Sequence, residues 1–145
     1  MKPINEMKLS FEGRSCNEGF ARSAVAAFVA VLDPNMEELS DIKTAVSEAV
    51  TNCIVHGYRD KIGTVYIHAK IFEGARVTIN IKDHGCGIED VKKAMEPLFT
   101  TCETGERAGL GFSIMGSFMD KLRVRSKPGS GTSVTLEKTI VSKGK

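Results

Sequence analysis

The stretch T-V-Y-I-H-A-K-I-F-E-G-A-R-V-T-I-N-I-K-D-H-G-C-G, residues 64–87, carries the clearest structural pattern in the chain. Residues rich in β-branched and apolar side chains flank Glu73-Gly74, which is the pattern of two strands joined by a tight turn. We expect these strands over 64–72 and 75–82. The D-H-G-C-G segment that follows is too rich in glycine for a regular element. The stretch therefore predicts a β-hairpin whose second strand ends in a glycine loop.

The residues before this hairpin predict one more strand and then a helix. Met7, Leu9 and Phe11 alternate with polar residues, which indicates a half-buried strand. Ser15 or Asn17 is then placed to cap a first helix. The apolar side chains of that helix recur at helical spacing at Phe20, Ala24, Ala27, Phe28 and Val31.

A second helix is expected from about Asn35 to His56. Asp33-Pro34 ends the first helix and is suited to supply the N-cap and first residue of the second, because proline has a φ compatible with a first helical turn. Gly57 provides the C-terminal stop. One face of this helix is apolar and consists of Leu39, Ile42, Val46, Ala49, Val50 and Cys53.

The remaining elements predict a mixed fold. They are, in order, a short helix over about 89–95, a mobile loop over 98–108, a helix from Gly111 to Met119, and a hairpin that pairs 122–126 with 132–140. The resulting order, β-α-α-β-β-α-loop-α-β-β, predicts an α+β fold. We expect a two-layer sandwich with the helices on one face of a mostly antiparallel sheet.

Length and composition limit the classes of protein that fit. The 145 residues are enough for one domain, which we expect to span 1–145. The net charge of +2 gives no reason to expect binding to nucleic acid or to an anionic membrane. No secretory signal and no uncharged run of about 18 residues is visible, so we expect a soluble, cytoplasmic protein. The four cysteines form no C-x-x-C pair, and we expect them to be reduced and structural or incidental.

The second predicted helix carries the first candidate site residues. Glu48 and Asn52 lie one turn apart, so they share a face that is off the apolar stripe. A carboxylate and an amide that project together can act as a base and hold a metal ion. A solvated polar face is the other interpretation, but the small or apolar residues that continue this side as far as Gly57 argue against it.

Two glycine-rich segments are further candidates. Asp83 ends a strand before G-x-G, where the backbone can approach a flat ligand and the carboxylate can accept a hydrogen bond from an exocyclic amine. Gly109-Leu110-Gly111 opens a helix whose first amides favour anions. A common turn and simple capping, respectively, are the alternatives. The chain has neither a P-loop nor a dinucleotide-binding G-x-G-x-x-G.

The segment between these two candidates carries hydroxyls and a guanidinium. Thr100, Thr101 and Arg107 lie in the expected mobile loop. Such a loop, between two glycine-rich segments, is suited to cover phosphates as a lid, and an ordinary exposed loop is the alternative.

Taken in order, these segments resemble a known family. S-E-A-V-T-N-C-I-V-H-G-Y, D-H-G-C-G, L-F-T-T and G-L-G-F are similar to the N, G1, lid and G2 boxes of the Bergerat-type ATPases. That ATP-binding fold is shared by histidine kinases, the gyrase B subunit, the Hsp90 chaperones and the MutL repair proteins. Within it, the chain resembles the anti-sigma-F serine kinases of endospore-forming bacteria nearly from end to end.

The resemblance implies a role for each matching residue. Asn52 would hold Mg²⁺ with the phosphates of ATP, Glu48 would be the general base for a protein serine hydroxyl, and Asp83 would bind the adenine amino group. Arg22 in the first helix would contact protein partners. The other implied contacts to ATP or ADP are Gly85, Gly87, Thr100, Thr101, Arg107, Gly109, Leu110 and Gly111.

The resemblance also implies partners. Members of this family are homodimers that hold sigma-F inactive and phosphorylate a small antagonist protein on serine, which controls sporulation transcription. The chain departs from the family pattern at His84, at Cys86 and in the lid at 102–105. We expect these departures to affect the motion of the lid and the affinity for nucleotide, and not the chemistry. Histidine kinases, gyrase, Hsp90 and MutL need further domains for which we expect no room.

Two alternatives to that function stay open. One is the sister serine kinase of the general stress response, which acts on sigma-B. The other is a nucleotide-gated sigma-binding module without useful kinase turnover. Glu48 discriminates a kinase from such a module, because a binding module needs no base. We expect no direct contact with nucleic acid or a membrane.

Overall fold

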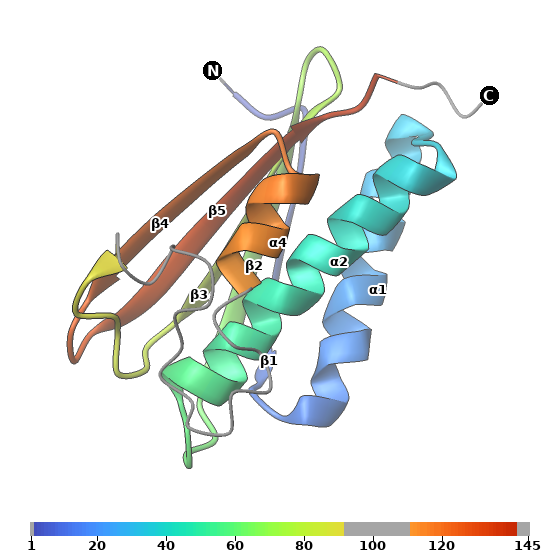
Figure 1. Ribbon diagram of the computed structural model, residues 1–145. Helices are drawn as coiled ribbons and strands as arrows, with labels where there is room; N and C mark the ends of the chain where they lie inside the picture. Colours follow the sequence, from blue (N-terminus) through green and yellow to red (C-terminus); the bar gives the residue numbers. More distant parts are fainter. Residues whose placement is uncertain (1, 92–110, 142–145) are drawn as a thin grey trace.

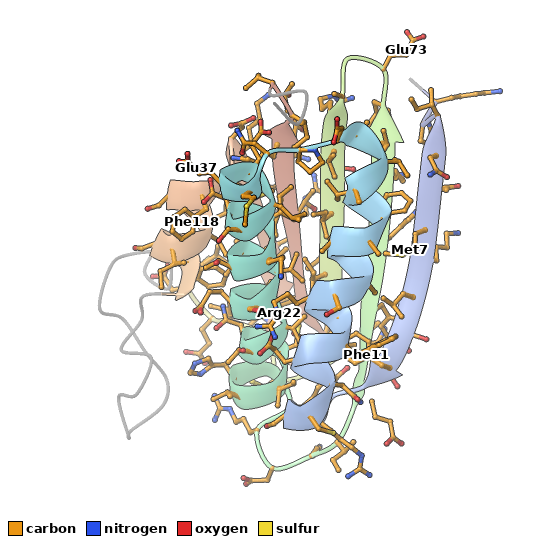
Figure 2. All side chains as sticks on the ribbon, turned by 90° about the vertical axis from the view of Figure 1, so that its right-hand side faces the viewer. Met7, Phe11, Arg22, Glu37, Glu73 and Phe118 are labelled. Atoms are coloured by element: carbon orange, nitrogen blue, oxygen red, sulfur yellow. The ribbon has the colours of Figure 1, made fainter. Side chains whose placement is uncertain are left out.

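The computed structural model describes residues 2–91 and 111–141 (Figure 1). It has two layers. The helices α1 (Glu18–Val29), α2 (Met36–Asn52) and α4 (Gly111–Phe118) lie side by side on one face of an antiparallel sheet (Figures 1 and 2). The α+β sandwich predicted from the sequence is therefore confirmed.

The sheet has five strands in the order β1-β2-β3-β5-β4, and every neighbouring pair is antiparallel. The strands are β1 (Asn5–Glu12), β2 (Thr64–Phe72), β3 (Arg76–Asp83), β4 (Lys121–Lys127) and β5 (Gly131–Thr139). Both predicted hairpins are confirmed. Because β5 lies between β3 and β4, Asp83 at the end of β3 pairs with Thr132 inside the sheet rather than at its edge.

The hydrophobic core fills the space between the layers. Alternate residues of the strands point toward the helices, as the period of two requires. The core combines Val65, Ile67, Ile71, Ile79, Ile81 and Leu136 of the sheet with Ala21, Val25, Ile42, Val46 and Met115 of the helices. Each fully buried aliphatic side chain contributes roughly 1.5–3 kcal/mol, so these contacts hold the helices in place over the sheet.

The apolar phase predicted for the first helix is wrong. The residues that α1 buries are Ala21, Val25 and Val29, whereas Phe20 is 53% exposed. Two overlapping apolar stripes share this helix, and spacing alone cannot rank them. The stripe of smaller residues faces the core because it lets α1 approach α2 and the sheet closely. Phe20 instead contacts Phe11 of β1 edge to face, with ring centroids 6.1 Å apart.

The start of α2 also differs from the prediction. Asp33 has a left-handed backbone (φ 55°) and follows a 3-10 turn, Ala30–Leu32, so it is not the N-cap. The N-cap is Asn35, whose side chain accepts a hydrogen bond from the Glu38 N–H at 2.7 Å. The Glu38 carboxylate in turn accepts one from the Asn35 N–H at 3.0 Å. This reciprocal capping box satisfies two backbone donors at once, which favours Asn35 over Asp33.

The first helix has no such cap. Asn17 occupies the N-cap position of α1, but its amide donates to the Glu12 carbonyl at 2.9 Å and makes no capping bond.

The end of α2 is the third difference. The α-helix ends at Asn52 and continues as a π-helical turn, Cys53–Gly57, instead of running regularly to His56. The predicted stop at Gly57 is confirmed. The helix expected over 89–95 lies mostly outside the described residues, and the loop expected over 98–108 lies entirely outside them.

Candidate functional site

Asp83 is a buried carboxylate at the point where β3 leaves the sheet, with only 3% of its surface exposed. Its Oδ1 accepts a hydrogen bond from the Gly85 N–H at 2.8 Å. Burial raises the pKa of Asp83 above its ordinary value, while hydrogen bonds from the Gly85 N–H, the Cys53 thiol and the Thr132 N–H act in the opposite direction. The strand and the surrounding donors therefore fix the orientation of this carboxylate.

The glycines around Asp83 allow a close approach of two backbone segments. A Cβ on Gly85 would collide with the carbonyl of Gly57, and a Cβ on Gly57 would come within 2.8 Å of Asp83 Oδ2. The Cys86 N–H donates to the Gly57 carbonyl at 2.8 Å, which joins the two segments. Gly87 has a φ of +76°, a conformation that favours glycine. The π-helical turn at the end of α2 thus packs directly on the loop that follows β3.

Tyr58 and Cys53 extend this junction. The Tyr58 hydroxyl donates to the Thr64 carbonyl at 2.5 Å and accepts from the His84 N–H at 2.8 Å, so it ties the loop to the start of β2. Burial raises the pKa of the Cys53 thiol well above its ordinary value, and the neighbouring Asp83 carboxylate acts in the same direction. Cys53 thus bonds to the Asp83 carboxylate, and Tyr58 holds the residue that follows Asp83.

Sequence reasoning missed the part that these two residues play. The only signal was their place in the run C-I-V-H-G-Y directly after Asn52, which predicted nothing beyond the helix end.

Two polar residues, Glu48 and Asn52, lie near the end of α2. Glu48 is only 6% exposed, although it is off the apolar stripe, so a solvated face is the wrong interpretation for this residue. Asn52, one turn later, lies against Gly111: a Cβ on Gly111 would come within 3.2 Å of both the oxygen and the nitrogen of the Asn52 amide. The fold therefore brings Asn52 of the first candidate pair to the glycine at the N-terminus of α4.

This arrangement can be tested for its fit to a nucleotide and a magnesium ion. Within residues 2–91 and 111–141, no three His, Cys, Asp or Glu side chains gather into a metal site. Magnesium in nucleotide sites takes one or two protein oxygens and completes its shell with phosphates and water, so the single amide of Asn52 is compatible with it. The N-terminus of α4 favours an anionic group nearby, and the fixed Asp83 carboxylate suits an amine donor. The described residues fit both groups.

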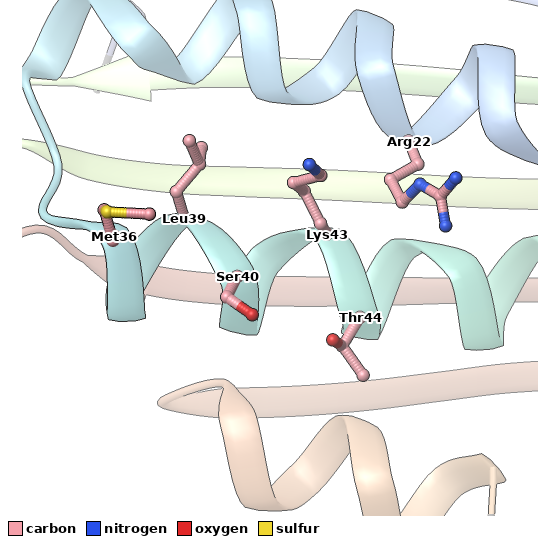
Figure 3. A pocket seen from close by; sticks show the side chains of 6 residues that line it. All are labelled: Arg22, Met36, Leu39, Ser40, Lys43 and Thr44. Carbon is pink, nitrogen blue, oxygen red and sulfur yellow. The ribbon is translucent and has the colours of Figure 1, made fainter.

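Arg22 lies on the outer side of the helical layer (Figure 2). Its guanidinium is 3.5 Å from the Glu18 carboxylate, and its side chain is 41% exposed. It lines a groove of about 400 Å³ with Met36, Leu39, Ser40, Lys43 and Thr44, all from the first half of α2 (Figure 3). The groove therefore reaches Thr44, which lies one helical turn before Glu48 on α2.

Several predicted site residues lie outside the described residues. These are Thr100, Thr101, Arg107, Gly109 and Leu110. Among the residues described, none of the helices has the length and apolar content needed to cross a membrane.

Comparison with known proteins defines the class of protein. A family described as the histidine kinase-like ATPase domain matches residues 17–138. The mycobacterial sensor histidine kinase MprB has the same fold, with a TM-score of 0.59 and 15% identity over 92% of this chain and 97% of that chain. The RsbU and RsbW domains of a Mycobacterium tuberculosis protein match with a TM-score of 0.69 and 17% identity, over 95% of this chain and 33% of that one. The fold is that of the histidine kinase-like ATPases.

Curated relatives narrow this class. The chain is 58% identical to the anti-sigma F factor of Thermoanaerobacter sp. (strain X514) over 98% of its own length and 99% of that protein. It is 54% identical to the anti-sigma F factor of Clostridium novyi (strain NT), over 95% and 96% of the two chains. The chain belongs to the histidine kinase-like ATPase family, in the branch whose curated members are named anti-sigma F factors.

Proposed function

We propose that this chain is an ATP-dependent anti-sigma factor of sporulation that inhibits sigma-F and phosphorylates an antagonist protein on serine. The observation that carries this proposal is the junction at the end of α2, where Asn52 lies against Gly111 and Gly57 against the buried Asp83. The names of the curated relatives support the choice of sigma-F over sigma-B.

In this proposal the adenine ring of ATP or ADP lies on the loop after β3. Asp83 accepts a hydrogen bond from the adenine amino group, and the glycines at 85 and 87 let the loop that follows Asp83 pack closely against the backbone of Gly57 and Lys127. The hydrogen bonds from Gly85, Cys53 and Thr132 hold the carboxylate in one orientation before the nucleotide arrives. Guanine carries a carbonyl at the corresponding position, so Asp83 would reject it.

The phosphates then lie between α2 and α4. Asn52 would hold a magnesium ion through its amide oxygen, and the ion would neutralise charge on the phosphates. The N-terminus of α4 at Gly111 favours the same anionic groups. Thr100, Thr101, Arg107, Gly109 and Leu110, assigned from sequence alone, would complete the phosphate contacts.

Glu48 takes the proton from the attacking serine in this proposal. It is one turn before Asn52 on the same helix, which would place the carboxylate near the phosphate that is transferred. Its low exposure keeps competing water away. A binding module that uses ATP only to change shape would not need this carboxylate, and that module remains the second candidate function.

The protein partners would contact Arg22. Arg22 and the groove beside it lie on the outer side of α1 and α2, and the groove reaches Thr44, one helical turn before Glu48 (Figure 3). We place the protein in the cytoplasm as a homodimer, in contact with sigma-F or the antagonist.

The proposal is tested with purified sigma-F and antagonist. Immobilised protein should retain sigma-F with Mg²⁺ and ATP, and should transfer the γ-phosphate to a serine of the antagonist. Retention of sigma-F without any phosphate transfer would leave the binding module as the function. Failure to bind either nucleotide would contradict the proposed site as a whole.

A further inference from the structure

The edge strand β4 carries a regular row of cations. Its sequence, K-L-R-V-R-S-K, alternates between exposed basic residues and half-buried residues along its whole length. The exposed set is Lys121, Arg123, Arg125 and Lys127, and all four point to the face of the sheet that the helices leave open. The set that faces the helices is Leu122, Val124 and Ser126.

These cations are poorly neutralised. Over residues 2–91 and 111–141, the one ion pair that β4 makes is Lys121 Nζ to Glu137 Oε2 at 3.9 Å, and Glu137 is shared with Arg76 at 3.3 Å. Arg123, Arg125 and Lys127 have no carboxylate within 4.0 Å in that part of the chain. Since the net charge of the whole protein is only +2, this strand is a local concentration of positive charge.

β4 is also a terminal strand of the sheet (Figure 1). In the described structure it pairs only with β5, so the backbone groups on its other side are available to a further strand. A second copy of β4 is a poor candidate, because pairing two copies would set cations opposite cations on one face, which is destabilising. The charges of β4 therefore disfavour pairing with a second copy of β4 and favour pairing with a strand of negative charge.

We propose that β4 binds an extended protein segment in which acidic and apolar residues alternate, and that this segment adds to the sheet as a sixth strand. Its acidic residues would lie opposite the basic residues of β4, with Cβ atoms about 4.5–5.5 Å apart, the ordinary distance between opposite residues on neighbouring strands. Its apolar side chains would extend the half-buried row of Leu122 and Val124. Backbone hydrogen bonds supply affinity in such strand addition, and alternate side chains supply specificity.

A single-stranded nucleic acid fits this surface less well. It would leave the free backbone groups of β4 unpaired, and it binds best where several aromatic rings offer stacking surfaces. The one large aromatic side chain exposed on the described open face is Tyr66, and its ring is already in an edge-to-face contact with His84. This inference does not depend on the function proposed for the nucleotide site.

The test uses three fluorescent probes and the full chain. The probes are a heptapeptide of alternating glutamate and valine, a heptapeptide of the same composition with four glutamates followed by three valines, and a twelve-nucleotide oligothymidylate. The variant is Arg123→Ser with Arg125→Ser. The matched control is Lys8→Ser with Lys70→Ser, which removes the same charge from the other side of the same face.

We expect the alternating peptide to bind at least about tenfold more tightly than its block isomer, and the β4 variant to lose about tenfold while the control loses little. Bound peptide should also slow amide hydrogen exchange within Lys121–Lys127. Equal binding of the two peptides, stronger binding of oligothymidylate, or equal losses in the two variants would overturn the proposal. No binding of either peptide would also overturn it, and would indicate that the cations only prevent unwanted strand pairing at this edge.

Discussion

Each end of α2 buries a carboxylate, and the two carboxylates lie in different surroundings. At the N-terminal end, the two oxygens of Glu38 accept hydrogen bonds from the backbone N–H groups of Asn35 and Val141, at 3.0 and 2.9 Å. This carboxylate caps the helix and binds the segment that follows β5, through the N–H of Val141. At the C-terminal end, Glu48 is buried to a similar extent and lies one turn before Asn52, which lies against Gly111 at the start of α4.

The two carboxylates are similarly buried, so burial alone gives no reason to assign a function to either. Glu38 is occupied by backbone donors that fold the chain, so its removal should affect stability. At its C-terminal end, α2 continues as a π-helical turn, a feature that is frequent at functional sites. Gly57 at the end of this turn also makes a close contact with the loop after β3. Changes there should affect ligand binding or reaction more than folding.

The largest expected effect comes from Glu48→Gln. A positioned base contributes roughly 10²–10⁴-fold in rate, or about 3–5 kcal/mol of barrier, so phosphorylation of the antagonist should slow by that factor. Single-turnover measurements with saturating ATP isolate this step from nucleotide binding. Glu38→Gln is the matched control, because it changes a second buried glutamate of the same helix and should leave the rate unchanged. A Glu48→Gln rate within threefold of the parent would remove the base assignment.

Asp83→Asn should have the next largest effect, on nucleotide affinity. The asparagine loses a charge-assisted acceptor in a buried position and turns an N–H toward existing donors, which should cost roughly 1.5–3 kcal/mol of binding to ATP and ADP. Isothermal titration calorimetry of both nucleotides measures this. Circular dichroism confirms that the variant is folded, and a folded variant with unchanged affinity would contradict the adenine contact.

Arg22→Ala should affect protein partners and not the nucleotide. An exposed arginine at the centre of a protein interface typically costs about 2 kcal/mol or more when truncated. The Glu18 contact is half exposed, so losing it should change stability little. Affinity chromatography with sigma-F and the antagonist measures the change, with ATP titration as the control. Undiminished retention of both partners would show that Arg22 is not part of the interface with them.

The smallest of these effects is expected for the stability of Glu38→Gln. The amide can still accept from the Asn35 N–H, but it loses an acceptor for either that donor or the Val141 N–H, at a cost of about 1–2 kcal/mol. Thermal unfolding should show a melting temperature lower by a few degrees with unchanged ATP affinity. A fall in nucleotide affinity at temperatures where the variant is folded would break the contrast between the two ends of α2.

The sequence predicted most of the fold because its strongest signals are local. Alternation and the Glu73-Gly74 turn determined the hairpin, and Gly57 marked the end of the second helix. The phase of α1 was not predictable, since Ala21, Val25 and Val29 compete with a stripe of larger residues. The choice depends on how closely the helix approaches α2. The N-cap at Asn35 was missed because Asp33-Pro34 is also a good local signal.

The candidate site was predicted in part. Glu48, Asn52, Asp83, Gly85 and Gly111 were named from spacing and resemblance, but spacing gave no reason for the burial of Glu48. The contacts between Gly57 and Gly85, or between Tyr58 and His84, join segments more than 20 residues apart along the chain. Long-range contacts of this kind do not follow from any local period.

The most direct test of the account is the nucleotide preference of the unmodified protein. Calorimetric titration with ATP, ADP and GTP in the presence of Mg²⁺ compares ligands that differ at the adenine amino group and at the γ-phosphate. With Asp83 as the acceptor for that amino group, ATP and ADP should bind and GTP should bind at least about tenfold more weakly, the loss expected from one charge-assisted hydrogen bond. Equal affinities for ATP and GTP would contradict the placement of the nucleotide on the loop after β3.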